Sequence, residues 1–283
     1  MKFTKLFWFD LRRGFFQRPQ WFLIPVIVAL TSCLTLSAGA AGLDDMETFQ
    51  VTASPGFWDY IMYLYGGMDR FIPAPGNLFT FPVRWMMVFL PAAFLTLQYP
   101  FSDLQGLGQQ ILIRTKGRMA WWLSKCGWNL CSILVYHGLM FLTAALFCAA
   151  TQADFSDGFH KELLYVVFQV REVGQTAADT VWQCSMVLLP VLVSLSLSLL
   201  QMSLALVLKP VFSFFAVASV MISSAYCTSP WLIGNYGMTI RYDTVITDGV
   251  SIKSGVICCV AALLAAVFAG CAGFLRYDIL NRD

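Results

Sequence analysis

Charge is scarce in this 283-residue sequence. Charged side chains make up 12% of it, about half of their share in soluble domains. Hydrophobic residues make up 58%, and the mean hydropathy is +0.69. So little polar chain cannot cover a water-soluble globule of this length, which excludes the class of soluble globular proteins. The composition predicts an integral membrane protein.

Catalytic and metal-binding signatures are also absent. The chain has two histidines and nine cysteines, but no Cys-x-x-Cys pair, no His-Glu-x-x-His, no Gly-x-Ser-x-Gly, no Walker phosphate loop and no dinucleotide fingerprint. We therefore expect no enzyme active site, no metal and no bound cofactor in this chain, and no nucleic acid among its partners. An enzyme hidden in the acidic outer loops is the alternative, although no paired carboxylate spacing supports it.

Six continuous apolar runs are long enough to cross a bilayer, which needs roughly 20 residues of helix. Continuous hydrophobicity favours helices over a barrel, whose strands would alternate. The predicted fold class is an all-α membrane protein with six transmembrane helices in a single membrane domain, residues 1–283. The predicted spans are 21–42, 81–99, 121–151, 181–208, 211–232 and 254–275.

The distribution of charge predicts the orientation of these spans. With both termini in the cytoplasm, the inner segments hold twelve cations and four acids, and the outer segments hold six cations and twelve acids. This asymmetry obeys the positive-inside rule. The basic stretch "ILIRTKGRMAWWLSK", residues 111–125, then lies on the cytoplasmic side.

The first 18 residues predict an interfacial helix. Phe3, Phe7, Leu11 and Phe15 recur at four-residue steps along one face. A charged tail that only anchors the first span is the alternative.

Polar groups inside the spans are few. His137 is the only ionisable side chain deep in a span, and we expect it to bond to a neighbouring helix, while Arg84 and Lys125 lie near span ends where they can snorkel. The alternating serines of 194–198 are expected to bond to their own helix. Small residues in 262–273 predict close helix contact. Without mid-depth carboxylates, ion-driven transport is not expected, so any power source lies elsewhere.

Two outer loops carry aromatic and glycine-rich motifs. The loop 43–80 contains "GFWDYIMYLYGGMDRF", which we expect on the outer membrane surface. The loop 233–253 contains "GNYGMTIRYD".

The inner loop 102–118 predicts a short cytoplasmic helix. Ser102 followed by Gln105 is typical of a capping box, so we expect a helix to begin there, run to Ile113 and break near Gly117. Its polar end should be exposed to a partner.

Taken together, the amino-terminal helix, the long first outer loop, the inner "IRTKGRMAWWLSK" segment, the "GNYGMTIR" motif and the end "FLRYDILNRD" resemble the permease subunit of an ABC-2 type ABC transporter. The resemblance implies a type V exporter-like architecture in a bacterial cytoplasmic membrane. It also implies a second permease copy, as a homodimer or heterodimer, and a separate ATPase subunit that binds ATP and Mg. The substrate class would be amphipathic: a peptide or bacteriocin, a drug or a lipid-like molecule.

The resemblance also assigns candidate residues. The ATPase-coupling positions are Ser102, Asp103, Gln105, Gln109, Gln110 and Arg114, flanked by Arg12 and Arg13. The sequence "DLQGLGQQ" departs from the family, whose members often have an acidic-basic cluster followed by Gly-Thr. Membrane lipid headgroups are an equal alternative for the cations of 114–118. Trp85, Met86, Phe89 and Phe214 are candidates for a translocation path, with core packing as the alternative.

Two other functions stay open at this point. One is a self-protection pump that expels antimicrobial peptides. The other is a membrane scaffold or sensor that binds a partner through the basic loop without transporting anything.

Overall fold

A computed structural model describes residues 2–16, 19–44, 55–115, 117–155, 160, 180–246 and 249–277. Throughout these residues the chain forms helices and turns, with one isolated β-bridge between Tyr242 and Val250. The predicted all-α class is therefore confirmed for the described part of the chain.

Six long helices coincide with the six predicted apolar runs. By length and composition, four of these helical segments can cross a membrane, at Pro19–Ala41, Arg118–Thr151, Gln183–Leu204 and Ile252–Arg276. The fifth helix, α9, is apolar but has 17 residues, and α4 does not belong to that group of four. The six helices are α2 (Leu23–Asp44), α4 (Val83–Leu104), α6 (Arg118–Thr151), α8 (Thr180–Leu204), α9 (Pro210–Tyr226) and α10 (Ile252–Arg276).

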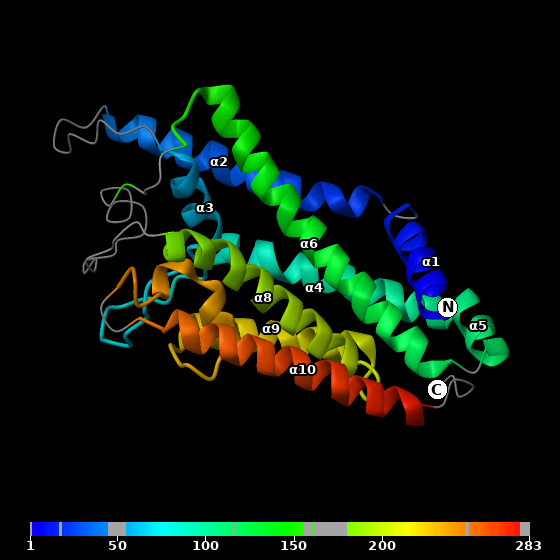
Figure 1. Cartoon of the computed structure of the whole chain (residues 1–283). Helices are drawn as coiled ribbons and strands as arrows, with labels where there is room; N and C mark the ends of the chain where they lie inside the picture. The colour runs from blue at the N-terminus through cyan, green and yellow to red at the C-terminus, as the bar shows by residue number, and fades with distance from the viewer. Residues whose placement is uncertain are drawn as a thin grey trace.

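Helix α8 forms the centre of the bundle. In its most apolar 18-residue window 61% of the residues are buried, against 22–33% in the equivalent windows of the other three candidate spans. It packs against α10, α4, α6 and α9 (Figure 1). The exposed apolar side chains of the surrounding helices are then available to lipid.

Helix α1 (Lys2–Phe16) lies against the inner part of α6, near α5 (Leu107–Thr115) at the end of the bundle where α10 finishes (Figure 1). Gly14 allows this close approach, because a Cβ there would lie 2.1 Å from Nε1 of Trp128. Trp8 and Phe16 stay exposed. The predicted amino-terminal helix is confirmed, and its location in a membrane interface stays a prediction.

The short helix α3 (Phe57–Tyr65) was expected on the outer membrane surface, and this expectation is wrong. Residues 59–65 are all buried, and α3 packs against α2, α4, α6 and α8. The reason is that Asp59 is the one charged residue of "FWDYIMYLY", and its carboxylate accepts bonds from the backbone N–H groups of Gly56 and His160, so the helix can be buried without an unpaired charge. Burial within the bundle removes more apolar surface from water than a surface location would.

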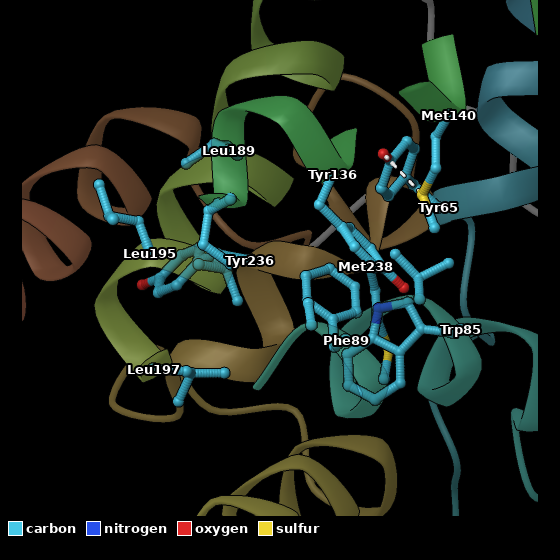
Figure 2. Close-up of a cluster of buried hydrophobic side chains, with 14 of the residues drawn as sticks. Tyr65, Trp85, Phe89, Tyr136, Met140, Leu189, Leu195, Leu197, Tyr236 and Met238 are labelled. Carbon is cyan, nitrogen blue, oxygen red and sulfur yellow. Dashed lines mark hydrogen bonds between the residues drawn. The ribbon is translucent and has the colours of Figure 1, made fainter. Parts of the chain in front are cut away.

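The "GNYGMTIR" segment also lies inside the protein. It forms two short 3-10 helices, Ile233–Gly237 and Thr239–Arg241, whose residues 234–242 are all buried. Trp85 Nε1 donates to the Gly237 carbonyl at 2.8 Å, and Figure 2 shows Trp85 and Phe89 from α4 gathered with Met238. Irregular backbone is tolerated at this depth because protein, not lipid, surrounds it.

The small residues of α10 contact α8 and α6 within the same chain. Ala266 and Gly270 are buried, and a Cβ on Gly270 would lie 2.0 Å from Cζ2 of Trp122. Ser203 of α8 donates to the Ala266 carbonyl at 2.7 Å. The predicted close helix contact is confirmed, and it lies inside the subunit.

Candidate functional site

A buried ionic cluster joins three helices at the α5 end of the bundle. Lys125 Nζ of α6 lies 2.6 Å from Asp10 Oδ1 of α1 and 2.7 Å from Asp103 Oδ2 of α4. The exposed fractions of these three side chains are 0%, 0% and 2%. The expectation that Lys125 snorkels is wrong, because two carboxylates within the protein replace the water that snorkelling would provide.

The cluster is completed by polar and aromatic neighbours. Arg13 Nη1 lies 3.3 Å from Asp103 Oδ1, so two cations balance two carboxylates. Tyr99 donates to Asp10 Oδ1 at 2.9 Å, and Ser124 donates to Asp10 Oδ2 at 2.5 Å. The ammonium group of Lys125 also lies 4.6 Å from the ring centroid of Tyr99. Every oxygen of the two carboxylates therefore has a partner, which is the condition for burying charge.

Helix α5 is seated directly on this cluster. A Cβ on Gly108 would lie 2.2 Å from Oδ2 of Asp103, so only glycine lets the first turn of α5 approach the carboxylate. Asp103 itself stands one turn before α5. Asp103 therefore lies against α5 and is paired with Lys125 of α6.

The predicted coupling residues differ in exposure. Ser102, Gln105, Gln110, Arg114 and Arg12 are exposed, and Gln109 and Arg13 are partly buried. Asp103 was expected to be exposed, and this is wrong, because its carboxylate is held by the two cations of the cluster.

The predicted capping box at Ser102 is also wrong. Helix α4 continues to Leu104, and Ser102 lies inside it, with its hydroxyl donating to the Tyr99 carbonyl at 3.0 Å. A serine within a helix commonly makes this bond to the preceding turn. The separate short helix begins at Leu107, and the predicted break at Gly117 is confirmed by the start of α6 at Arg118.

The candidate path residues lie in the core. Trp85, Met86 and Phe89 are no more than 5% exposed, and Phe214 is partly buried against Phe94. Their contacts are those of packed side chains. A role in a translocation path stays a prediction.

A small pocket lies beside the cluster. Its volume is about 50 Å³, and Tyr99 belongs to both the pocket and the cluster. Its walls come from α1, α4, α6 and the 3-10 turn Pro19–Phe22, which precedes α2. The lining residues are Gly14, Trp21, Phe22, Leu95, Gln98, Tyr99, Ser102 and Trp128.

A second buried cation, Arg241, was missed by the sequence analysis. Its exposed fraction is 0%, and its guanidinium donates to four backbone carbonyls and one side-chain amide oxygen at 2.5–3.1 Å. Burial lowers the pKa of Arg241 to about 10, so the group stays charged at neutral pH. The acceptors belong to Met68, Asp69, Ser224, Ala225 and Asn235.

His137 bridges two helices, as predicted. Its Nδ1 lies 2.7 Å from the Tyr65 hydroxyl of α3, and its Nε2 lies 2.8 Å from the Ser194 hydroxyl of α8. The prediction for the serines of α8 is right in part. Ser196 bonds to its own helix at Leu192 but also to the Cys259 carbonyl of α10, and Ser198 donates to Asn129 of α6.

No protein-family model, no curated protein and no solved structure matches this chain.

Proposed function

We propose that this chain is the transmembrane permease subunit of an ATP-driven ABC-2 type exporter, which moves an amphipathic substrate across a bacterial cytoplasmic membrane. The observation that carries the proposal is the buried cluster of Lys125, Asp10 and Asp103 beneath α5. A permease without its own ATP site needs a connection from its surface to its spanning helices. The cluster is such a connection between an exposed helix and α6.

The exposed side of α5 is the proposed contact for the ATPase subunit. Gln105, Gln110 and Arg114 are exposed there, together with Arg12 of α1. When the partner hydrolyses ATP with Mg, it displaces α5, and the ion pairs of Asp103 transmit the displacement to α6. In this arrangement the chain itself contributes no catalytic residue.

Six crossings with both termini in the cytoplasm fit this role. Helices α1, α5 and the end of α10 lie at one end of the bundle (Figure 1). The surplus of cations in the predicted inner segments supports a cytoplasmic location for that end. A second permease copy completes the proposed exporter.

Co-expression with an ATPase subunit encoded beside the gene tests the proposal. The complex should purify as one species in detergent, and its ATPase rate should rise over that of the ATPase alone. Gln110→Arg should weaken the complex, because it adds a bulky charge on the exposed side of α5. Gln152→Arg is the matched control, because Gln152 is equally exposed but lies at the opposite end of α6.

The outcomes separate the alternatives. A stable complex that neither binds nor hydrolyses nucleotide would support a scaffold or sensor and overturn transport. If the complex makes cells more resistant to antimicrobial peptides, and this resistance depends on ATP hydrolysis, the exporter is a self-protection pump.

A further inference from the structure

One face of α6 carries a continuous stripe of buried polar side chains. At about 100° per residue, the side chains of this stripe fall within an arc of about 60° and extend over about 16 Å of helix. Their exposed fractions are 0% or 1%. The stripe consists of Lys125, Asn129, Ser132 and Tyr136.

A matching polar face of α8 meets this stripe. Ser194, Ser198 and Gln201 also fall within about 60° of one another. Ser198 donates to Asn129 Oδ1 of the stripe at 2.7 Å. One turn away on α8, Ser194 lies 2.8 Å from Nε2 of His137, which stands beside the stripe on α6. The two faces therefore form one polar seam between α6 and α8. The seam consists of Lys125, Asn129, Ser132 and Tyr136 of α6 and Ser194, Ser198 and Gln201 of α8.

Several polar atoms of the seam have no hydrogen-bond partner. They are Asn129 Nδ2, Ser132 Oγ, the Tyr136 hydroxyl and both amide atoms of Gln201. A buried polar group without a partner costs about 1–3 kcal/mol, and native proteins keep few of them. Among the described residues, half of those with a buried, unpartnered side-chain N or O atom belong to this seam. Because these atoms lie at one helix interface, they indicate a shared partner.

The chemistry of the seam identifies that partner. Between Asn129 and Tyr136 the seam offers amides and hydroxyls, which both donate and accept, so it favours a small neutral partner over an ion. Steps of three and four residues along α6 correspond to about 4.5–6 Å, which one water with two hydrogen bonds spans. A buried water requires two to four polar partners, and the seam supplies them.

We propose that the seam between α6 and α8 is a column of bound water that extends from the ionic cluster toward mid-membrane. At the far end it stops at apolar packing, since Met140, one turn beyond Tyr136 on α6, is fully buried and accepts a bond from Tyr65 at 3.6 Å (Figure 2). At the near end, Lys125 with Asp10 and Asp103 closes it. The cluster is then a gate as well as a connection. This inference goes beyond the proposed function, because it holds for any role of the chain.

Thiol labelling tests the column without any ATPase. Ser132→Cys is placed in a variant whose native cysteines are replaced, and the vesicles are treated with a small water-soluble methanethiosulfonate reagent. A thiol reacts as the thiolate, which forms only in contact with water. Two matched controls are neighbours on α6: Ile133→Cys, which is buried, and Leu134→Cys, which is 51% exposed on the apolar surface.

With the gate intact, Ser132→Cys should react slowly, because the reagent is larger than water. Adding Asp103→Asn should raise the rate at Ser132→Cys at least about tenfold and leave Ile133→Cys unchanged, because it weakens the gate. Equal rates at positions 132 and 133, with and without Asp103→Asn, would overturn the proposal.

Hydrogen exchange of the unmodified chain gives a second readout if the cysteine-replaced variant fails to fold. The backbone amides of 129–136 should exchange faster than those of 140–148, which lie in the same helix beyond the proposed end of the column. Equal protection of the two segments would also overturn the column. Neither result depends on whether an ATPase binds.

Discussion

Two fully buried cations stabilise opposite regions of this protein in different ways. Lys125 at the α5 end is neutralised by two carboxylates that come from two other helices, 115 and 22 residues away in sequence. Arg241 is held by uncharged oxygens of the chain segments around it, and among the described residues no carboxylate oxygen lies within ion-pair distance.

The kind of partner, side-chain carboxylate or backbone carbonyl, determines whether each region can move. Ion pairs between side chains of three separate helices can break and reform when the helices move. A guanidinium enclosed by backbone carbonyls fixes the backbone itself, because four of its five acceptors are main-chain oxygens. We therefore interpret the Lys125 cluster as a movable joint and the Arg241 cage as a static support.

The largest expected effect comes from Lys125→Met. It leaves two buried carboxylates facing each other without their shared cation, so the free energy of unfolding should fall by about 3–5 kcal/mol. Unfolding in mixed detergent micelles measures this change. Lys209→Met, at an exposed lysine, is the control and should change stability by less than about 0.5 kcal/mol. A similar small change for Lys125→Met would contradict the importance of the cluster.

Arg241→Lys keeps the charge and should still destabilise the chain by about 2–4 kcal/mol. The three donors of an ammonium cannot serve the five acceptors that the guanidinium serves, and each buried acceptor left alone costs about 1–3 kcal/mol. The same unfolding titration measures the loss. If lysine were tolerated without loss, the cage would be no more than a site of positive charge.

A combined variant distinguishes the joint from the cage. Adding Asp10→Asn and Asp103→Asn to Lys125→Met removes the unpaired charges and should restore about 2 kcal/mol of the stability that Lys125→Met loses. No such rescue exists for Arg241, because its backbone acceptors cannot be mutated away. A triple variant less stable than Lys125→Met would show that the carboxylates are held by something other than this lysine.

The smallest effect is expected at the edge of the cluster. The side chain of Arg13 is 24% exposed, so Arg13→Gln should reduce stability by less than about 1 kcal/mol. The change should shrink further in high salt, which screens exposed charges. Arg12→Gln, on the exposed side of α1, should have no measurable effect. A loss comparable to that of Lys125→Met would place Arg13 inside the buried network.

Local sequence patterns predicted most of the helices. They did not predict which residues contact the buried polar side chains. The apolar runs predict the ends of α2, α4, α6, α8, α9 and α10 to within about six residues, since hydropathy is a property of contiguous chain. Asp10 is the one acid of the basic first 18 residues, and Asp103 is the one acid of the basic loop 102–118. An isolated acid in a basic segment could have indicated the buried ion pairs. Arg241 had a weaker signal, an arginine between the apolar residues Ile240 and Tyr242.

The segments expected in outer loops show the same limit. The α3 region and "GNYGMTIR" are too short to span a membrane, so their length alone suggested loops. Their real place is decided by packing with helices distant in sequence, as in the bond from Trp85 to Gly237, 152 residues apart.

By itself, the sequence determined that this is a helical membrane protein and roughly where its long helices lie, because a continuous apolar run must satisfy its backbone internally. Only the tertiary structure decided that Lys125 is buried between two acids, that α3 lies inside the bundle and that unpaired amides and hydroxyls meet along α6 and α8. The physical reason is that the stability of a buried polar group depends on which atoms surround it, and those atoms are brought there by the fold.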